Sequence, residues 1–379
     1  MGERCSFVTC LVAVLAVTGC ADKPAFSGAT PDFASKSVDR PNGTVPFSMT
    51  PHFASFTAPE PLIGSIKIGK DGVVEMNGRS SYVHFNSGTF TRTAYNIHPA
   101  QNVTGQGDIN ALTVGPPANS HGAIYTILRH SPFGVEPFST VGRYDVVSGA
   151  VAESAPLTLL GDQLLVSLAH AGDGNVWVTG SEPAPLGQMG FAFVVSPALN
   201  QLMTGLAAPY NDPLDAITYA PDGGMYVATI AGPNPPGPAI RSRIFRIDSH
   251  TYARTATCKL PANSFVAAMT GGPDSRVWFT DTGLNEIGRV DAKCTLTYFN
   301  VPTASAGLSG ITSAPDNALY FSEKNANKIG RITTAGVVTE YAIPAPGTQP
   351  QGIVAARAKV PPVLFFVENG ELGRLSFTP

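Results

Sequence analysis

The residues of this chain with the strongest potential for chemistry are acidic and amide side chains at the ends of short apolar runs. Hard divalent cations such as Mg²⁺ and Ca²⁺ take oxygen ligands, so several of these side chains meeting at one point would form a cation or ligand site. The alternative is that each one caps loop amides, because a position fixed by a repeat needs no ligand to explain it. The candidates are Asp108, Asn110, Asp215, Asp281, Glu323, Gln351 and Glu368.

Motifs typical of common catalytic centres do not occur in the sequence. The seven histidines show no pair at metal-ligand spacing, and no His-Glu-x-x-His, Gly-x-Ser-x-Gly, Walker or Gly-x-Gly-x-x-Gly pattern is found. A net charge of −3 without a basic cluster excludes nucleic acid as a partner. No catalytic residue is therefore assigned from a motif.

A sequence repeat positions the candidate residues. Pro315-Asp316 follows Pro273-Asp274 by 42 residues, and Gly330-Arg331 follows Gly288-Arg289 by the same 42. Within residues 310–344, four short alternating runs are separated by turn signals such as Ala-Pro-Asp-Asn and Thr-Ala-Gly. Four antiparallel strands in a repeat of this length predict a β-propeller blade.

The number of repeats predicts an all-β fold with seven blades of four antiparallel strands, in one domain at residues 61–379, with six blades as the alternative. Residues 62–99 form either a degenerate first blade or the strand that closes the ring. The last unit lacks its outer strand, which would leave an unpaired edge, so we expect an N-terminal strand to close the ring. The other units span residues 109–155, 162–208, 214–261, 264–302, 308–344 and 351–377.

The repeat resembles that of virginiamycin B lyase and streptogramin lyase-like proteins. The resemblance rests on Gly-Ile-Thr, Ala-Pro-Asp-Asn, Leu-Tyr-Phe-Ser-Glu and Asn-Lys-Ile-Gly-Arg-Ile-Thr, all within residues 310–344. It is close at residues 264–302 and 308–344, fair at 214–261, and thin before about residue 160. It implies a seven-bladed propeller, and it reports architecture more reliably than activity.

The resemblance also implies where lyase chemistry would lie. In that family a histidine begins a first strand in a Glu-x-His-Gly-Ile-Thr pattern, a glutamate follows fourteen residues later, and the acidic pair holds Mg²⁺. Here Glu323 is present, but Ser309 stands at the histidine position and Gly307 at the earlier glutamate. No blade keeps the histidine with its glutamate. The residues at the histidine position of the other blades are Asn110, Val166, Asp215, Ala267 and Gln351.

The N-terminus predicts export and lipid attachment. Residues 1–20 combine Arg4 with an apolar run at 7–17 that is too short to cross a membrane. Val17-Thr18-Gly19-Cys20 resembles a bacterial lipobox, which implies acylation of Cys20 and anchoring in a lipid membrane of the cell envelope, at the outer membrane on either its periplasmic or its outer surface. An ordinary secretory signal is the alternative. Residues 21–60, rich in Pro and Ser, predict a tether.

The mature domain keeps two cysteines, Cys258 and Cys294. An oxidising compartment favours a disulfide between them. Against it, the repeat places Cys258 near the end of one fourth strand and Cys294 near the beginning of the next, which puts them on opposite faces if the two strands run parallel. The sequence leaves this pairing open.

The expected binding place is the axial mouth where first strands begin and second strands end. The leading interpretation is a monomeric, lipid-anchored propeller that binds a small molecule, glycan or protein there, without the family's histidine–glutamate pair. One alternative is a metal-dependent C–O lyase or lactonase that uses Mg²⁺ or Ca²⁺. Another is a scaffold protein of the cell envelope.

Overall fold

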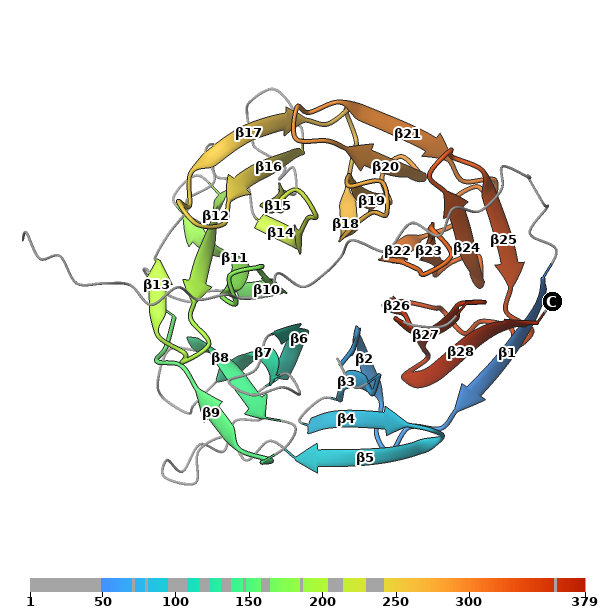
Figure 1. Ribbon diagram of the computed structural model, residues 1–379, viewed down its shortest axis with the longest axis horizontal. Coiled ribbons are helices and arrows are strands. Elements are labelled where there is room, and N and C mark those ends of the chain that lie inside the picture. Colours follow the sequence, from blue (N-terminus) through green and yellow to red (C-terminus); the bar gives the residue numbers. More distant parts are fainter. Residues whose placement is uncertain are drawn as a thin grey trace, which may run out of the picture. The chain divides into compact units, whose positions relative to one another are not determined.

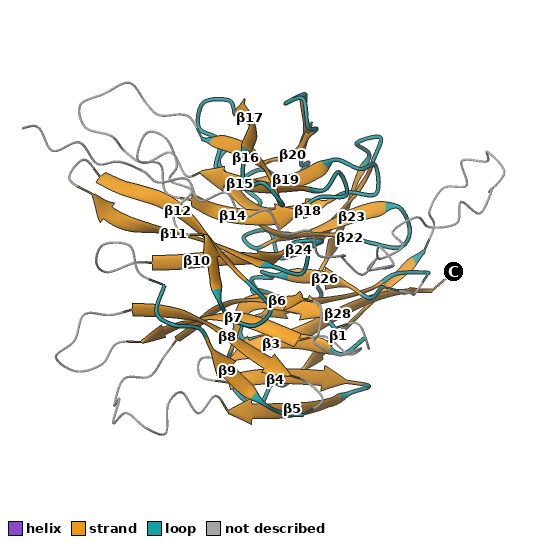
Figure 2. Ribbon diagram, turned by 60° about the vertical axis from the view of Figure 1, so that its left-hand side comes forward, coloured by secondary structure: helices purple, strands orange, loops and turns teal. Residues whose placement is uncertain are grey.

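Seven four-stranded antiparallel sheets are arranged around a common centre (Figure 1). The seven-bladed propeller predicted from the repeat is therefore confirmed, and the six-bladed alternative is wrong. The described residues contain only strands and loops (Figure 2), and no helix among them could cross a membrane. The computed structural model describes residues 49–69, 72–78, 81–94, 108–115, 123–130, 138–145, 148–157, 164–184, 187–203, 214–229, 242–357 and 360–378.

The blades are numbered here in chain order, and the strands of each are given from the centre outward. Blade 1 holds β2 (Leu62–Ile68), β3 (Val74–Gly78), β4 (Ser81–Asn86) and β5 (Thr89–Ala94). Blade 2 holds β6 (Asp108–Gly115), β7 (Ala123–His130), β8 (Phe138–Asp145) and β9 (Val151–Glu153). Blade 3 holds β10 (Leu164–His170), β11 (Val176–Ala184), β12 (Gly187–Val195) and β13 (Gln201–Met203). Blade 4 holds β14 (Leu214–Tyr219), β15 (Gly224–Thr229), β16 (Arg243–Asp248) and β17 (Arg254–Lys259). Blade 5 holds β18 (Val266–Gly271), β19 (Val277–Asp281), β20 (Glu286–Val290) and β21 (Leu296–Asn300). Blade 6 holds β22 (Leu308–Ser313), β23 (Ala318–Glu323), β24 (Lys328–Thr333) and β25 (Val338–Ala342). Blade 7 holds β26 (Ile353–Ala355), β27 (Val363–Glu368), β28 (Glu371–Thr378) and, outermost, β1 (Thr50–Phe56).

Turn chemistry places the strands of blade 6 where the repeat predicted them. Between β22 and β23, Ala314 N donates to Ala318 O at 2.9 Å, and Asn317 adopts a φ of 57°. Between β24 and β25, Gly336 has a φ of 90°, which glycine reaches without steric strain. The residues that break the apolar alternation are therefore the residues that reverse the chain.

The core consists of seven apolar clusters, and each one lies between two neighbouring blades. Trp177 of blade 3 packs with Phe245 of blade 4, and Trp278 of blade 5 packs with Phe321 of blade 6. Both indole rings are fully buried, so they contribute to the packing between blades. A blade has little core of its own, so its stability depends on the blades on both sides.

The ring is closed by β1, which pairs antiparallel with β28 from Thr50↔Thr378 to Phe56↔Leu372. This confirms the expected N-terminal closing strand. Residues 62–94 form the complete blade 1, so the segment whose role the sequence left open is a blade and the closing strand precedes it. Because β1 lies within residues 21–60, the last part of the predicted tether belongs to the propeller.

Cys258 and Cys294 form a disulfide with a Cα–Cα distance of 5.0 Å. The objection that the two cysteines would lie on opposite faces was wrong. It assumed that the two fourth strands run side by side in the same direction, along the propeller axis. Strand twist accumulates outward through a blade, so β17 and β21 run along the rim and follow one another head to tail (Figure 1). Cys258 in β17 therefore lies beside Cys294 in the turn before β21, and the bond joins blades 4 and 5.

Replacing both cysteines by serine is expected to lower the free energy of unfolding by about 4 kcal/mol, because the bond closes a loop with a sequence separation of 36. Urea unfolding of the wild type with and without reductant, beside the Cys258→Ser/Cys294→Ser variant, measures this. The variant should be insensitive to reductant. A wild type whose midpoint does not move on reduction would contradict the disulfide.

Candidate functional site

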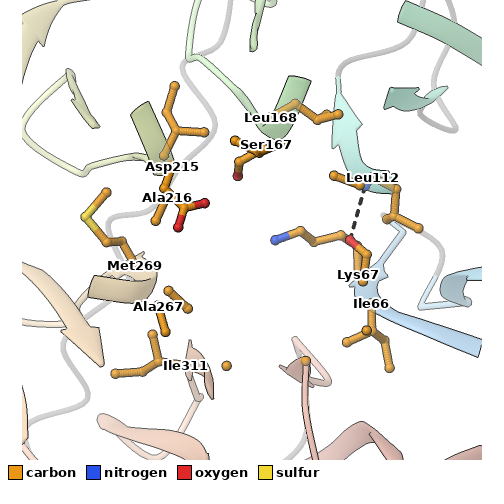
Figure 3. A pocket seen from close by; sticks show the side chains of 18 of the residues that line it. Ile66, Lys67, Leu112, Ser167, Leu168, Asp215, Ala216, Ala267, Met269 and Ile311 are labelled. Carbon is orange, nitrogen blue, oxygen red and sulfur yellow. Dashed lines mark hydrogen bonds between the residues drawn. The ribbon is translucent and has the colours of Figure 1, made fainter. Parts of the chain in front are cut away.

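A cavity of about 310 Å³ lies on the propeller axis and is lined by the first strands of all seven blades. Its accessible lining is mainly polar, because the side chains of Ile66, Leu112, Leu168 and Ile311 beside it are buried between the blades (Figure 3). The sequence predicted binding on the same axis, at the mouth where first strands begin and second strands end. A space of this size suits a small molecule.

Backbone irregularities recur in the strands around this cavity. In six blades the pairing between first and second strands shifts register near the cavity, as between Leu214 and Ile217 in blade 4. Such bulges re-aim side chains and release backbone groups from the ladder. The positions that correspond to the family's histidine, including Asp215, therefore lie where the inner strand is not fully paired with the second strand of its own blade.

Hydroxyl groups of second strands hold these irregular segments across blade boundaries. Thr179 Oγ1 donates to Asp215 O of the next blade at 2.7 Å, and Thr280 Oγ1 donates to Ser309 O at 2.7 Å. Ser322 Oγ donates to Gln351 O in the same way. Neighbouring blades thus fix the backbone at the place where site residues would be expected.

Lys67 of β2 and Asp215 of β14 extend into the cavity from opposite walls (Figure 3). Burial lowers the pKa of the Lys67 ammonium and raises the pKa of the Asp215 carboxyl to about 6. Lys67 is nevertheless exposed to the channel, and Asp215 is partly exposed. Among the described residues, neither side chain takes part in a salt bridge or side-chain hydrogen bond.

Asp215 was among the predicted candidates, whereas Lys67 was missed. The signal that could have identified Lys67 was its charge in the middle of a first strand. It directly follows Ile66, the first residue to pair with the second strand after the register shift. The corresponding positions in the other blades carry no charge: Thr113, Ala169, Thr218, Thr270, Thr312 and Val354. Comparing only the histidine position of each blade does not reveal this difference.

Asp281 ends the second strand of blade 5 and acts as a cap. Its Oδ1 accepts hydrogen bonds from Phe265 N at 2.9 Å and Leu284 N at 3.2 Å, and the side chain is fully buried. The interpretation of Asp281 as a residue that caps loop amides therefore agrees with the structure.

Glu323 and Glu368 end the second strands of blades 6 and 7, and both are buried. Neither carboxylate oxygen of Glu323 has a hydrogen-bond partner. Burial raises the pKa of Glu323 to about 8, assisted by Glu340 and opposed by Lys328. Burial also raises the pKa of Glu368, although hydrogen bonds from the hydroxyls of Ser55 and Thr348 lower it in part. At pH 7 the Glu323 carboxyl therefore favours the neutral form.

Among the remaining candidates, Gln351 is not one of the residues that line the cavity. Asp108 and Asn110 belong to β6, and their side chains lie outside the described residues. Gln351 accepts from Ser322 through its backbone, and its side chain lies beside Gly64. No group of three or more His, Cys, Asp or Glu side chains in the described part of the chain could hold a metal ion. The described donors therefore do not fit the Mg²⁺ that the resemblance implied.

Comparisons with known proteins agree with the fold and the repeat. The sequence model of the virginiamycin B lyase family matches residues 162–378. A streptogramin B lyase structure shares 20% identity with a TM-score of 0.67, covering 86% of this chain and 98% of that one. Virginiamycin B lyase from Staphylococcus aureus shares 19% identity with a TM-score of 0.62, covering 86% of this chain and 99% of that one. A catalytically inactive variant of that enzyme with quinupristin gives 19% identity, a TM-score of 0.63 and coverage of 86% and 99%.

At these identities, the similarity to solved structures establishes a shared fold. No curated protein sequence matches the chain significantly.

Replacing Glu323 with glutamine is expected to reduce the loss of stability as pH rises from about 5 to 8. The native carboxyl, with a pKa of about 8, keeps its proton to a higher pH than the unfolded chain, whose value is near 4.5. Its contribution to stability is therefore complete below about pH 4.5 and disappears as pH passes 8. Urea unfolding from pH 5 to 9 should show a pH-dependent loss smaller by a few kcal/mol in the variant.

The two proteins provide their own control at pH 5, where both carry an uncharged side chain at position 323. Parallel pH profiles for wild type and Glu323→Gln would show that this carboxyl titrates normally.

Proposed function

Because the chain belongs to the virginiamycin B lyase family, we propose that it binds a small molecule in its axial cavity without carrying out the streptogramin lyase reaction. The observation that supports this most strongly is the pair of charged side chains, Lys67 and Asp215, that face one cavity from opposite walls. An ammonium and a carboxylate that face one cavity without partners favour a ligand that supplies opposite charges. The ligand class we infer is a small zwitterion.

The size of the cavity favours a small molecule over the glycan or protein that the sequence also allowed. Seven inner strands enclose about 310 Å³, which accommodates a small ligand and excludes a folded partner. The mainly polar lining between the two charged groups suits a ligand that also forms hydrogen bonds. The described interior therefore supports recognition inside the channel more than docking across its mouth.

The absence of the lyase reaction rests on sequence positions. Ser309 occupies the position at which the family carries its histidine, and a serine hydroxyl is not a general base at neutral pH. Glu323, which follows fourteen residues later, is buried with a raised pKa and favours the neutral form at pH 7. A protonated carboxyl is a poor ligand for Mg²⁺.

A second candidate is proton-transfer catalysis of the lyase or lactonase type, and Asp215 favours it. This residue stands at the histidine position of blade 4, and its pKa of about 6 is close to that of an imidazole. It could accept a proton from a bound substrate while Lys67 stabilises a developing negative charge across the cavity. Elimination of the lyase type would need no further reactant, whereas lactone hydrolysis would also consume a water molecule, from which Asp215 would accept the proton.

The lipobox-like sequence that ends at Cys20 supports a location at a membrane of the cell envelope. Acylation of Cys20 would hold the propeller at a membrane of the cell envelope, with residues between Cys20 and β1 as the connection. Detergent-phase partitioning of the full-length protein is expected to be lost in Cys20→Ser. A Cys20→Ser protein that still partitions with detergent would contradict lipid attachment.

The axial site can be tested with ω-amino acids of increasing length, from glycine to 6-aminohexanoate. One or more of them should raise the melting temperature of the wild type, because a ligand that binds only the native state stabilises it. The effect should be lost in Lys67→Met and in Asp215→Asn, and kept in Lys293→Gln, which alters an exposed turn. Butyrate and butylamine, with one charge each, should be weaker than 4-aminobutyrate. Equal responses in all variants would exclude the axial cavity as the site.

Incubation with streptogramin B, with and without Mg²⁺, is expected to give no ring opening. Simple lactones tested alongside address the second candidate, for which activity should rise through about pH 6 and disappear in Asp215→Asn. Streptogramin turnover that EDTA and Glu323→Ala abolish would show that the family reaction is retained and would refute the proposal.

A further inference from the structure

An arginine recurs at one position of the third strand, opposite an aromatic ring of the second strand. The aromatic–arginine pairs in register are Tyr226↔Arg246, Trp278↔Arg289, Tyr320↔Arg331 and Phe365↔Arg374, in blades 4, 5, 6 and 7. Arg143 of blade 2 stands opposite Tyr125 in the same way. These arginines lie at the end of the propeller opposite the axial mouth, near the turns that follow the first strands.

In blades 4 to 6, an aspartate of the turn between first and second strands receives this arginine. The shortest distances are 2.9 Å for Asp222–Arg246, 3.2 Å for Asp274–Arg289 and 2.9 Å for Asp316–Arg331. In blade 6 the contact is two-pronged, since both Nε and Nη2 of Arg331 donate to Asp316 Oδ2. In blade 2, Arg143 Nη1 donates to Pro197 O at 2.6 Å. Each of these four arginines therefore has an acceptor.

Blade 7 keeps the arginine and lacks the acid. The sequence from Ala356 to Val363 reads Ala-Arg-Ala-Lys-Val-Pro-Pro-Val, with two basic residues and no aspartate. The Arg374 guanidinium lies 5.4 Å from the ring centroid of Phe56, and its Nε is buried without a hydrogen-bond partner. No hydrogen bond or ion pair joins Arg374 to any residue that the structure describes. A buried donor without an acceptor is unfavourable unless something else supplies one.

A cavity of about 650 Å³ opens beside Arg374, between blades 7 and 1. Val74, Phe85 and Phe365 give it apolar walls, and Arg357 stands exposed at its edge. None of the described residues that line it is acidic. We call this the seam cavity, because it lies beside the blade in which β1 closes the ring.

We propose that the seam cavity binds a small carboxylate with an aromatic body, whose carboxylate occupies the place that Asp222, Asp274 and Asp316 take in their blades. The Nε edge of Arg374 then donates to the carboxylate, as that of Arg331 does to Asp316. Arginine suits such planar, two-pronged recognition of a carboxylate. Phe85 and Phe365 provide ring faces and edges for the body of the ligand.

Isothermal titration with phenylacetate tests the proposal, with phenylacetamide as the uncharged analogue of the same shape. Wild type is expected to bind phenylacetate at least about tenfold more tightly than phenylacetamide, since the charged contact is lost in the amide. Arg374→Gln should lose binding by a similar factor, whereas Arg254→Gln, an arginine exposed on the rim, should not. Lys293→Gln, which alters an exposed turn, should also bind normally.

A grafted turn gives a second test that does not remove the arginine. Replacing residues 357–362 with Pro-Asp-Asn, the sequence that follows Ala314 in blade 6, should place an aspartate within hydrogen-bond distance of Arg374, as Asp316 is of Arg331. The graft is expected to raise the melting temperature and to abolish phenylacetate binding, because the new side chain fills the anion position. Equal affinity for phenylacetate and phenylacetamide, or unchanged binding in Arg374→Gln or in the graft, would overturn the proposal.

Discussion

The closure of the ring by β1 is the constraint on which the rest of this structure depends. Blade 7 derives three strands from the C-terminus and its fourth from residues 50–56, so both ends of the propeller chain meet in one sheet. Each apolar cluster lies between two blades, and an open ring would expose one of them. Closure also completes the ring of seven inner strands around the channel that Lys67 and Asp215 enter.

The fold could be predicted because the same pattern of strands and turns recurs several times along the sequence. The turn signals of blades 5 and 6 gave the strand order, and the missing outer strand of the last repeat required a strand from elsewhere. The disulfide could not be judged from the same pattern, since the pairing of Cys258 with Cys294 depends on how far the fourth strands twist toward the rim. The start of the propeller was placed too late because β1 lies in a Pro- and Ser-rich segment without a steady period.

The candidate site was only partly predictable, because position within a blade and chemical environment are different kinds of information. The repeat identified Asp281 and Glu323 as strand-ending acids, yet the structure gives Asp281 two amide donors and Glu323 none. It identified Asp215 through the histidine position of the family. It did not identify Lys67, which directly follows Ile66, the first residue of β2 to pair with β3 after the register shift. The charge of Lys67 is unusual only when the same position is compared in all seven inner strands. Burial decides the protonation state of these groups, and a sequence does not report burial.

The central claim is that Lys67 and Asp215 face the channel as separate, uncompensated groups. The most direct measurement is the titration of Lys67 followed by NMR of its ε-methylene carbon, in the wild type and in Asp215→Asn. The structure predicts a pKa below the ordinary value of 10.5 that changes little when Asp215 is replaced, because burial is its cause. A pKa above 10.5 that falls in Asp215→Asn would show that the two groups neutralise each other, and it would contradict the axial cavity as a site that awaits a charged ligand.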